Sequence, residues 1–239
     1  MKTVSLCITN YQSGDTIALC IESIRKFTQY PHEIAVYDDA TGPALYDDLT
    51  YLRAAQAKGW LRLIEGKSRV MHGMALATLL DTVTTDLAMI MDCDIQILKP
   101  GWLELMIEQQ EKTGAALISD IETFPDNVAI ASWFFMLDMA QYPSVKAEWG
   151  YTQKVSGDAS AGLYPTGYQI YKNILDQGRI IAPFPNGLSP DRPSGPTLYY
   201  RHHCHISVLS MPQVGPCWDV RQRRYAVIQG ELKKLRLGI

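Results

Sequence analysis

Two carboxylates stand close together near the middle of this chain, where an apolar segment ends. The segment Leu87–Met91 has the composition of a buried strand, and Asp92-Cys93-Asp94 follows it directly. Carboxylates presented together at the end of a strand can hold Mg²⁺ or Mn²⁺, which completes its ligand shell with water and substrate phosphates. The pattern therefore predicts a divalent-cation site for phosphate chemistry, with Asp92 and Asp94 as ligands.

Strands and helices must alternate through the first half of the chain to position this pair. Apolar segments predict the strands, and apolar residues repeated every three or four positions predict the helices. Such alternation is typical of an α/β fold with a mostly parallel central sheet. Strands are expected at 3–9, 33–37, 60–64, 87–91 and 115–119. Helices are expected over 15–24 (capped by Ser13 or Asp15), 44–59, 74–80 and 100–114.

The second half of the chain has a less regular pattern. Residues 128–137 predict one long apolar strand, and a helix is expected from about 161 to 177. The basic segment 221–236 predicts an amphipathic helix. We therefore expect one domain with a regular half, 1–120, and an irregular half, 121–239.

Polar residues follow two further predicted strands. Asn10 and Tyr11 come after the first strand, and Asp38-Asp39 after the second. Ligands of an open parallel sheet bind beyond the carboxyl ends of its strands. Asn10 and Asp39 could hydrogen-bond a base and ribose, and Tyr11 could stack on the base. Taken alone, the Asp38-Asp39 pair is equally consistent with a solvated turn.

A phosphatase that carries the same Asp-x-Asp motif is the first alternative. Haloacid dehalogenase-like phosphatases place Asp-x-Asp on the first strand and continue with Thr or Val two residues later. Here the motif follows the fourth predicted strand, and Gln96 stands at that position. Both differences disfavour the phosphatase.

The order of these motifs resembles that of the GT-A fold glycosyltransferases, especially the inverting family-2 group. The matching segments are Val4–Tyr11, Val36–Asp39, His72-Gly73 and the aspartate pair, so the resemblance covers roughly 3–140. It implies a Rossmann-like GT-A domain over 1–239, with nucleotide-sugar binding in the first half and acceptor binding in the second.

The resemblance also implies individual roles. Asn10 and Asp39 would contact the nucleoside, and the helix after His72-Gly73 would approach the ribose and diphosphate. Asp92 would lie at the ribose, the diphosphate and the metal. The implied activity is sugar transfer from a UDP- or GDP-sugar to an acceptor hydroxyl, with Mn²⁺ or Mg²⁺ and inversion. Lys67 and Arg69 could add charge near the diphosphate or be ordinary loop cations.

Late histidines could complete the metal site, because many GT-A enzymes take a third ligand from one. His203 and His205 are the candidates in Arg201–His205, since alternation along a strand would put both on one face and His202 on the other. A packing role is equally compatible with each histidine.

The general base is harder to assign, because the Glu-Asp pair and Gln-x-x-Arg-Trp motif of many family-2 enzymes are missing. Asp158 is the preferred base, although an Asp at a helix start is also a good cap. Asp120 and Glu122 are the competing bases. Trp133 is expected to line the acceptor side, where sugar rings pack on aromatic faces.

Composition limits the remaining possibilities. The net charge of −3 gives no general attraction to nucleic acid, and five cysteines without Cys-x-x-Cys spacing suit free thiols in a reducing compartment. We expect a cytoplasmic protein, with weak contact of the basic C-terminal helix with a membrane surface as a further expectation. A nucleotidyltransferase of related fold and a non-catalytic nucleotide-sugar binder remain as alternatives.

Overall fold

The structure is a computed structural model. It describes residues 1–40, 48–124, 127–131, 133–146, 152–153, 163–164, 168–188, 197, 199–203 and 216–238. The helices are α1 (Asp15–Phe27), α2 (Asp48–Ala57), α3 (His72–Leu80), α4 (Trp102–Thr113), α5 (Tyr142–Val145), α6 (Tyr168–Asp176) and α7 (Pro216–Leu237). The strands are β1 (Val4–Asn10), β2 (Glu33–Asp38), β3 (Arg62–Glu65), β4 (Leu87–Asp92), β5 (Ile95–Ile97), β6 (Leu117–Ile118), β7 (Ile121–Phe124), β8 (Asn127–Ile130), β9 (Phe134–Asp138), β10 (Thr152–Gln153), β11 (Leu163–Tyr164), β12 (Ile181–Ala182) and β13 (Tyr200–His202).

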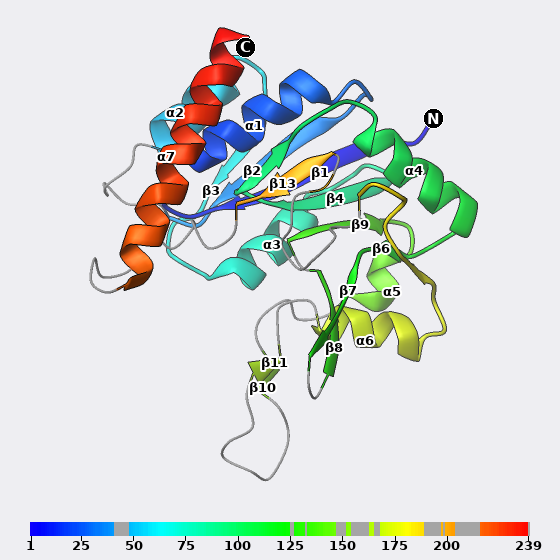
Figure 1. The fold of residues 1–239 in the computed structure, drawn as a ribbon. Coiled ribbons are helices and arrows are strands. Elements are labelled where there is room, and N and C mark those ends of the chain that lie inside the picture. The colour runs from blue at the N-terminus through cyan, green and yellow to red at the C-terminus, as the bar shows by residue number, and fades with distance from the viewer. Residues whose placement is uncertain are drawn as a thin grey trace.

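A seven-stranded sheet runs through the centre in the order β12-β6-β9-β4-β1-β2-β3 (Figure 1). β1 pairs in parallel with β2 and β4, and β2 pairs in parallel with β3. β9 lies antiparallel between β4 and β6. The predicted mostly parallel sheet is confirmed, with β9 as its reversed strand.

The register of the sheet sets the carboxyl ends of its central strands side by side. Asn10 on β1 lies opposite Asp38 on β2, and Thr9 lies opposite Asp92 on β4. Because these strands are parallel, the polar residues that follow them gather at one edge, called here the carboxyl edge. The reversed strand β9 ends at the opposite, amino edge, with Asp138 opposite Leu87.

Helices cover both faces of the sheet. α1, α2 and α4 share one core cluster with β1 and β4, whereas α3, α5 and α6 share a second cluster on the other face. The apolar face predicted for α1 is confirmed, because Ile17, Ile21 and Ile24 are fully buried.

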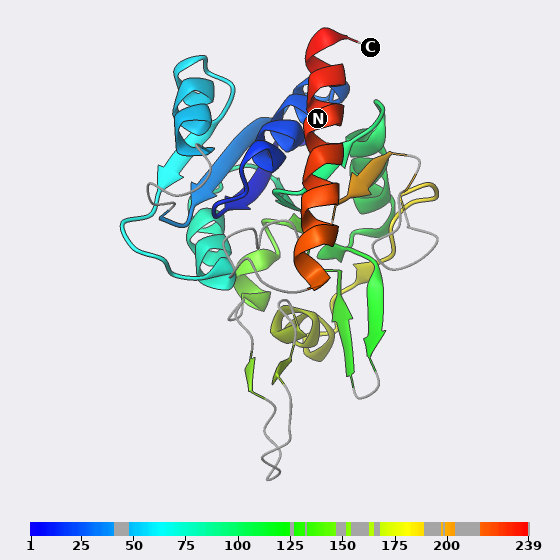
Figure 2. The same ribbon diagram turned by 60° about the vertical axis from the view of Figure 1, so that its left-hand side comes forward.

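The helix α7 forms an outer layer against α1, far away in the sequence (Figures 1 and 2). Ile228 and Leu232 bury themselves against Ala18 and Leu19 of α1. This arrangement confirms the helix expected over 221–236. Within the described part of the chain, no helix is both long enough and apolar enough to cross a membrane.

Three local expectations are wrong. The single strand over 128–137 is two strands, because β8 pairs with β7 in a hairpin while β9 pairs with β4 and β6. The bend between them is held by the N–H of Ala131, which donates to Asp120 O at 2.9 Å and Ser119 Oγ at 3.1 Å. Both strands need apolar residues, so composition did not mark the break.

The helix expected from 161 begins later. Residues 163–164 form β11 in a two-stranded sheet with β10, and α6 starts at Tyr168. At α1, Gly14 occupies the N-cap and no side chain caps the helix. Ser13 is instead used within the polar network at the end of β1. The division into halves at residue 120 stays a prediction.

Candidate active site

The aspartate pair lies at the carboxyl edge of the sheet, as its sequence position predicts. Asp92 is the last residue of β4 and its side chain is 32% exposed, whereas Asp94 is only 3% exposed. The backbone is fixed on both sides: Asp92 N–H donates to Trp133 O at 2.8 Å, and His203 N–H donates to Asp94 O at 2.9 Å. The two carboxylates therefore come from a rigid strand end.

His202 is the histidine that meets this pair. Its Nε2 lies 3.2 Å from Asp94 Oδ1, and its side chain is 8% exposed. One possible ligand atom from each of Asp92, Asp94 and His202 lies within 4.8 Å of the other two. These residues, called here the metal triad, bring two carboxylates and an imidazole together.

The structure corrects the expectation that His202 points away and His203 faces the aspartates. β13 pairs antiparallel with β5, which puts His202 opposite Ile95. His203 then lies on the other side of the strand, where Nε2 is 3.0 Å from Gln96 Oε1. His202 and His203 do lie on opposite faces of the strand, as predicted, but the residue that faces the aspartates is His202. Pairing with β5 decides which of the two faces them. His205 lies outside the described residues.

The triad fits a divalent cation. Asp94 Oδ1 is buried and accepts no well-aligned hydrogen bond from the described residues, although buried carboxylate oxygens normally accept one; it faces His202 Nε2 at 3.2 Å, which is itself a possible ligand atom. Carboxylate oxygens suit Mn²⁺ and Mg²⁺, and an added imidazole favours a transition metal such as Mn²⁺. The poorly hydrogen-bonded Asp94 oxygen and the set of ligand atoms are what a cation site requires.

Electrostatics distinguish the two carboxylates. Burial raises the pKa of Asp92, and the charge of Asp94 adds to that rise, although His72 opposes it. Burial would also raise the pKa of Asp94, but contact with His202 and the charges of His202 and His203 outweigh it and lower that pKa. Asp94 is therefore the carboxylate held most firmly in its ionised form.

A second histidine lies on the other side of the pair. His72 is the first residue of α3, and its Nε2 lies 4.0 Å from Asp92 Oδ1. Its Nδ1 is 2.9 Å from Thr9 Oγ1, at the end of β1. Gly73 follows it, buried in α3. Thr9 thus orients the ring so that the other nitrogen faces the aspartates.

Asn10 is the centre of a buried polar network. It is 1% exposed, and its Nδ2 donates to Asp38 Oδ1 at 2.8 Å and to Asp48 Oδ2 at 3.3 Å. Ser13 Oγ donates to Asn10 Oδ1, and Ser13 N–H donates to Asp48 Oδ2 at 2.6 Å. The network ties the end of β1 to β2 and to the start of α2.

Asp39 holds the segment that leads into α3. Its two carboxylate oxygens accept the N–H groups of Val70, at 2.6 Å, and Met71, at 2.9 Å. Met71 has a φ of 73°, a left-handed conformation that is unfavourable for a side chain of this size. Asp39 therefore stabilises the strained residue that directly precedes His72.

Tyr11 and Arg69 contact each other near this edge. Tyr11 is partly exposed, and the guanidinium carbon of Arg69 lies 4.1 Å from the centre of its ring. Lys67 is an exposed loop residue. The structure thus brings Arg69 to the ring that is expected to stack on a base. The predicted general base, Asp158, lies outside the described residues.

Sequence reasoning missed three residues of this edge. His202 was assigned to the wrong face, and Thr9 and Asp48 were not singled out. Thr9 is next to Asn10 and opposite Asp92, so a register argument could have found it. Asp48 had no such signal, because only the folded chain brings it to Asn10.

Comparisons with known proteins bear on the family and the fold. The model of the family described as Glycosyl transferase family 2 matches residues 5–133, and a search of curated proteins finds no match. A solved structure of the mannosyltransferase PcManGT from Pyrobaculum calidifontis, with GDP-Man and Mn²⁺, has a TM-score of 0.59 at 14% identity, over 98% of this chain and 73% of its own.

Two further solved structures are similar. S. aureus TarS 1-349 with UDP-GlcNAc has a TM-score of 0.57 at 16% identity, over 97% of this chain and 66% of its own. GalNAc-T7 with UDP, GalNAc and Mn²⁺ has a TM-score of 0.60 at 12% identity, over 77% of this chain and 42% of its own. At these identities the similarity shows a shared fold.

Proposed function

This chain belongs to glycosyl transferase family 2, and we propose that it moves a sugar from a nucleoside-diphosphate sugar to an acceptor hydroxyl in a metal-dependent, inverting reaction. The predicted GT-A fold is confirmed by the family match and the solved structures. One observation carries the proposal of metal dependence. Asp92, Asp94 and His202 meet at the carboxyl edge of the sheet, and the buried Asp94 Oδ1 there faces His202 Nε2 without a well-aligned hydrogen bond from the described residues.

The metal triad would hold Mn²⁺ or Mg²⁺. When bound, the cation supplies positive charge that stabilises a departing diphosphate. Asp94, buried and ionised, would be the principal ligand, whereas the more exposed Asp92 lies nearer solvent. His202 reaches the site from the irregular half of the chain and so links that half to the donor site.

The start of α3 would add a second source of positive potential. The first N–H groups of a helix have no partner within the helix, and they favour anions. His72 stands at this start, and Thr9 turns its Nε2 toward Asp92. We propose that this turn of α3 and the His72 ring contact the diphosphate beside the cation, while Asp39 fixes the approach of the chain.

Donor recognition would use the other strand ends. Tyr11 offers a partly exposed ring for a base, and Asn10 and Asp39 remain the predicted nucleoside contacts. Each carboxylate oxygen of Asp39 accepts one amide N–H, and a carboxylate oxygen can accept a second donor. A UDP- or GDP-sugar is the expected donor, and the similar structures that hold UDP-GlcNAc and GDP-Man support this class.

The acceptor step rests on the sequence alone. Asp158 is the predicted base, taking the proton of the acceptor hydroxyl as that oxygen attacks the anomeric carbon. Direct attack of this kind inverts the configuration. A cytoplasmic location and a weak contact of α7 with an anionic membrane also stay predictions. Lys233, Lys234 and Arg236 are exposed on α7, where Lys234 pairs with Glu231 and Arg236 with Glu22.

A transfer assay tests the proposal. The purified protein is incubated with UDP- and GDP-sugars, a panel of hydroxyl acceptors and Mn²⁺, and the released nucleotide is identified. Release of nucleoside diphosphate together with a glycosylated acceptor, abolished by chelation of the metal, supports the proposal. Release of pyrophosphate would indicate a nucleotidyltransferase instead, and full transfer by Asp94→Ala would refute the role of the triad.

A further inference from the structure

We infer that Trp133 is a positioning residue for the metal triad rather than a platform for the acceptor. Its indole ring stacks on the imidazole of His202, with ring centres 5.3 Å apart and planes inclined by 21°. The inference rests on the proposed function, because it assumes that His202 binds the cation.

Trp133 contacts two members of the metal triad, His202 and Asp92. Its side chain lies against His202, and its backbone oxygen accepts the N–H of Asp92 at 2.8 Å. The ring is partly buried and packs against the main core cluster, so it is fixed by the body of the protein. One residue therefore connects the end of β4 to the end of β13.

His202 needs such support because of where it comes from. It ends a three-residue strand whose one pairing partner among the described residues is the equally short β5, and this pair lies outside the central seven strands. Backbone pairing places its Cα, but the plane of the imidazole must be set by side-chain contacts. Groups that orient a metal-binding histidine typically change metal affinity by about 10- to 100-fold.

The near-parallel geometry favours the positioning role. A ring that lies flat on His202 restricts the rotation of the imidazole while leaving its nitrogen atoms in the plane, free to bind a cation. The face of Trp133 that meets His202 is also lost to a sugar. The indole thus stiffens the third ligand before the metal arrives, which reduces the entropy lost on binding.

Two space-filling substitutions isolate the stack from the core packing. Trp133→Phe keeps an aromatic ring, whereas Trp133→Leu keeps an apolar side chain without one, and both retain the backbone bond to Asp92. Mn²⁺ is titrated into each protein by calorimetry, without nucleotide. Trp60→Ala is the control, since Trp60 contacts Arg25 at 3.5 Å on a different surface.

We expect Trp133→Leu to weaken Mn²⁺ binding about tenfold, as loss of an orienting contact does. Trp133→Phe should recover most of that loss, and Trp60→Ala should match the wild type. Equal Mn²⁺ affinity in wild type and Trp133→Leu would overturn the inference, including the case in which only the KM for the acceptor rises. A wild-type protein that binds no Mn²⁺ would overturn the proposed metal site as well.

Should Trp133→Leu fail to fold, Trp133→Met takes its place as the apolar variant without a ring, and the rise in Tm that Mn²⁺ produces supplies a second readout. A smaller rise in that variant than in the wild type and in Trp133→Phe supports positioning of His202. An equal rise in all three proteins at every Mn²⁺ concentration contradicts it.

Discussion

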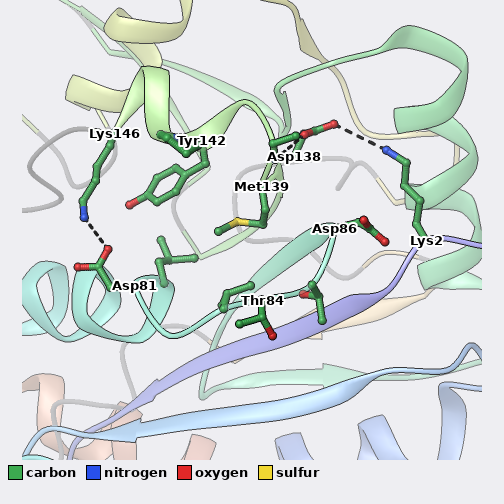
Figure 3. Close-up of a pocket in the computed structure, with 13 residues that line it drawn as sticks. Lys2, Asp81, Thr84, Asp86, Asp138, Met139, Tyr142 and Lys146 are labelled. Carbon is green, nitrogen blue, oxygen red and sulfur yellow. Dashed lines mark hydrogen bonds and ion pairs between the residues drawn. The ribbon is translucent and has the colours of Figure 1, made fainter.

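The two edges of the central sheet both carry carboxylates beside cationic groups. They differ in how completely the carboxylate oxygens are hydrogen-bonded within the protein. At the amino edge, a hollow of about 520 Å³ is lined by Lys2, Asp81, Asp86, Asp138 and Lys146 among others (Figure 3). At the carboxyl edge, the metal triad gathers two carboxylates and an imidazole.

Each amino-edge carboxylate has donors of its own. Asp138 accepts Gln110 Nε2 at 2.7 Å and the N–H of Ala140 at 3.0 Å, and Lys2 Nζ lies 3.7 Å from it. Asp86 accepts both the N–H and the hydroxyl of Thr3, which lower its pKa. Lys146 pairs with Asp81 across the hollow (Figure 3). The polar groups there stabilise the fold.

The carboxyl edge differs because the buried Oδ1 of Asp94 accepts no well-aligned hydrogen bond from the described residues and faces another possible metal ligand, His202 Nε2, at 3.2 Å. A buried oxygen without a good hydrogen bond costs stability, so its presence points to a ligand. Poorly satisfied ligand atoms that face one another, rather than a hollow or the number of charges, therefore distinguish the proposed site from a structural cluster.

The largest effect should follow removal of the principal metal ligand. Asp94→Asn keeps the size of the side chain but removes its charge, so the cation loses its most firmly ionised ligand. Loss of several kcal/mol of transition-state stabilisation corresponds to a rate decrease of roughly 100-fold or more. Transfer and Mn²⁺ binding are measured in parallel with circular dichroism. Wild-type turnover in a folded Asp94→Asn protein would show that the carboxyl edge, like the amino edge, is a structural cluster of charges.

The two adjacent histidines should differ sharply. His202→Ala removes the third ligand, and we expect Mn²⁺ affinity to fall by at least about tenfold, since even indirect support of a ligand has effects of that size. His203→Ala removes a buried ring that bonds to Gln96 and should lower the Tm while leaving Mn²⁺ affinity near that of the wild type. The reverse pattern, measured by calorimetry, would restore the original assignment of His203.

At the amino edge, Asp138→Ala should lower the Tm of the protein and leave its Mn²⁺ affinity unchanged. It removes the 2.7 Å acceptor of the buried Gln110 Nε2 and the acceptor of the Ala140 N–H, and an unsatisfied buried group costs about 1–3 kcal/mol. For a chain of this size, each kcal/mol shifts the Tm by roughly 2–4 °C. Thermal unfolding and Mn²⁺ titration of the same sample check both statements. A clear loss of Mn²⁺ affinity would mean that the two edges are coupled.

The smallest effect is expected at the exposed ion pair of the amino edge. Lys146 and Asp81 are about half exposed, and such surface pairs contribute about 0–1 kcal/mol. Lys146→Met should therefore leave both Mn²⁺ affinity and transfer unchanged and shift the Tm only slightly. A larger fall in Tm, measured by calorimetric scanning at low and high salt, would show that this pair stabilises the fold.

Much of the carboxyl edge could be predicted from the sequence, because strand ends follow from local patterns. Apolar segments marked β1, β2 and β4, and parallel pairing then placed Asn10, Asp38 and Asp92 at one edge. The helix α1 followed from its apolar spacing, and α4 followed from Pro100 at its start and Gly114 at its end.

What could not be predicted depends on contacts between distant segments. The phase of β13 is set by its pairing with β5, so His202 and His203 could not be told apart from their own neighbours. The same holds for the break between β8 and β9, where two different pairing partners replace one continuous strand. The stack of Trp133 on His202 likewise exists only in the folded chain.

Nucleotide binding with and without metal tests directly whether the metal triad holds a cation beside a nucleoside diphosphate. UDP and GDP are titrated into the wild-type protein and into Asp94→Asn, each with Mn²⁺ and with chelator. We expect at least one nucleoside diphosphate to bind the wild type more tightly in Mn²⁺, by at least about tenfold or 1.4 kcal/mol, and Asp94→Asn to lose this gain. Equally tight binding with Mn²⁺ and with chelator in the wild type would contradict it.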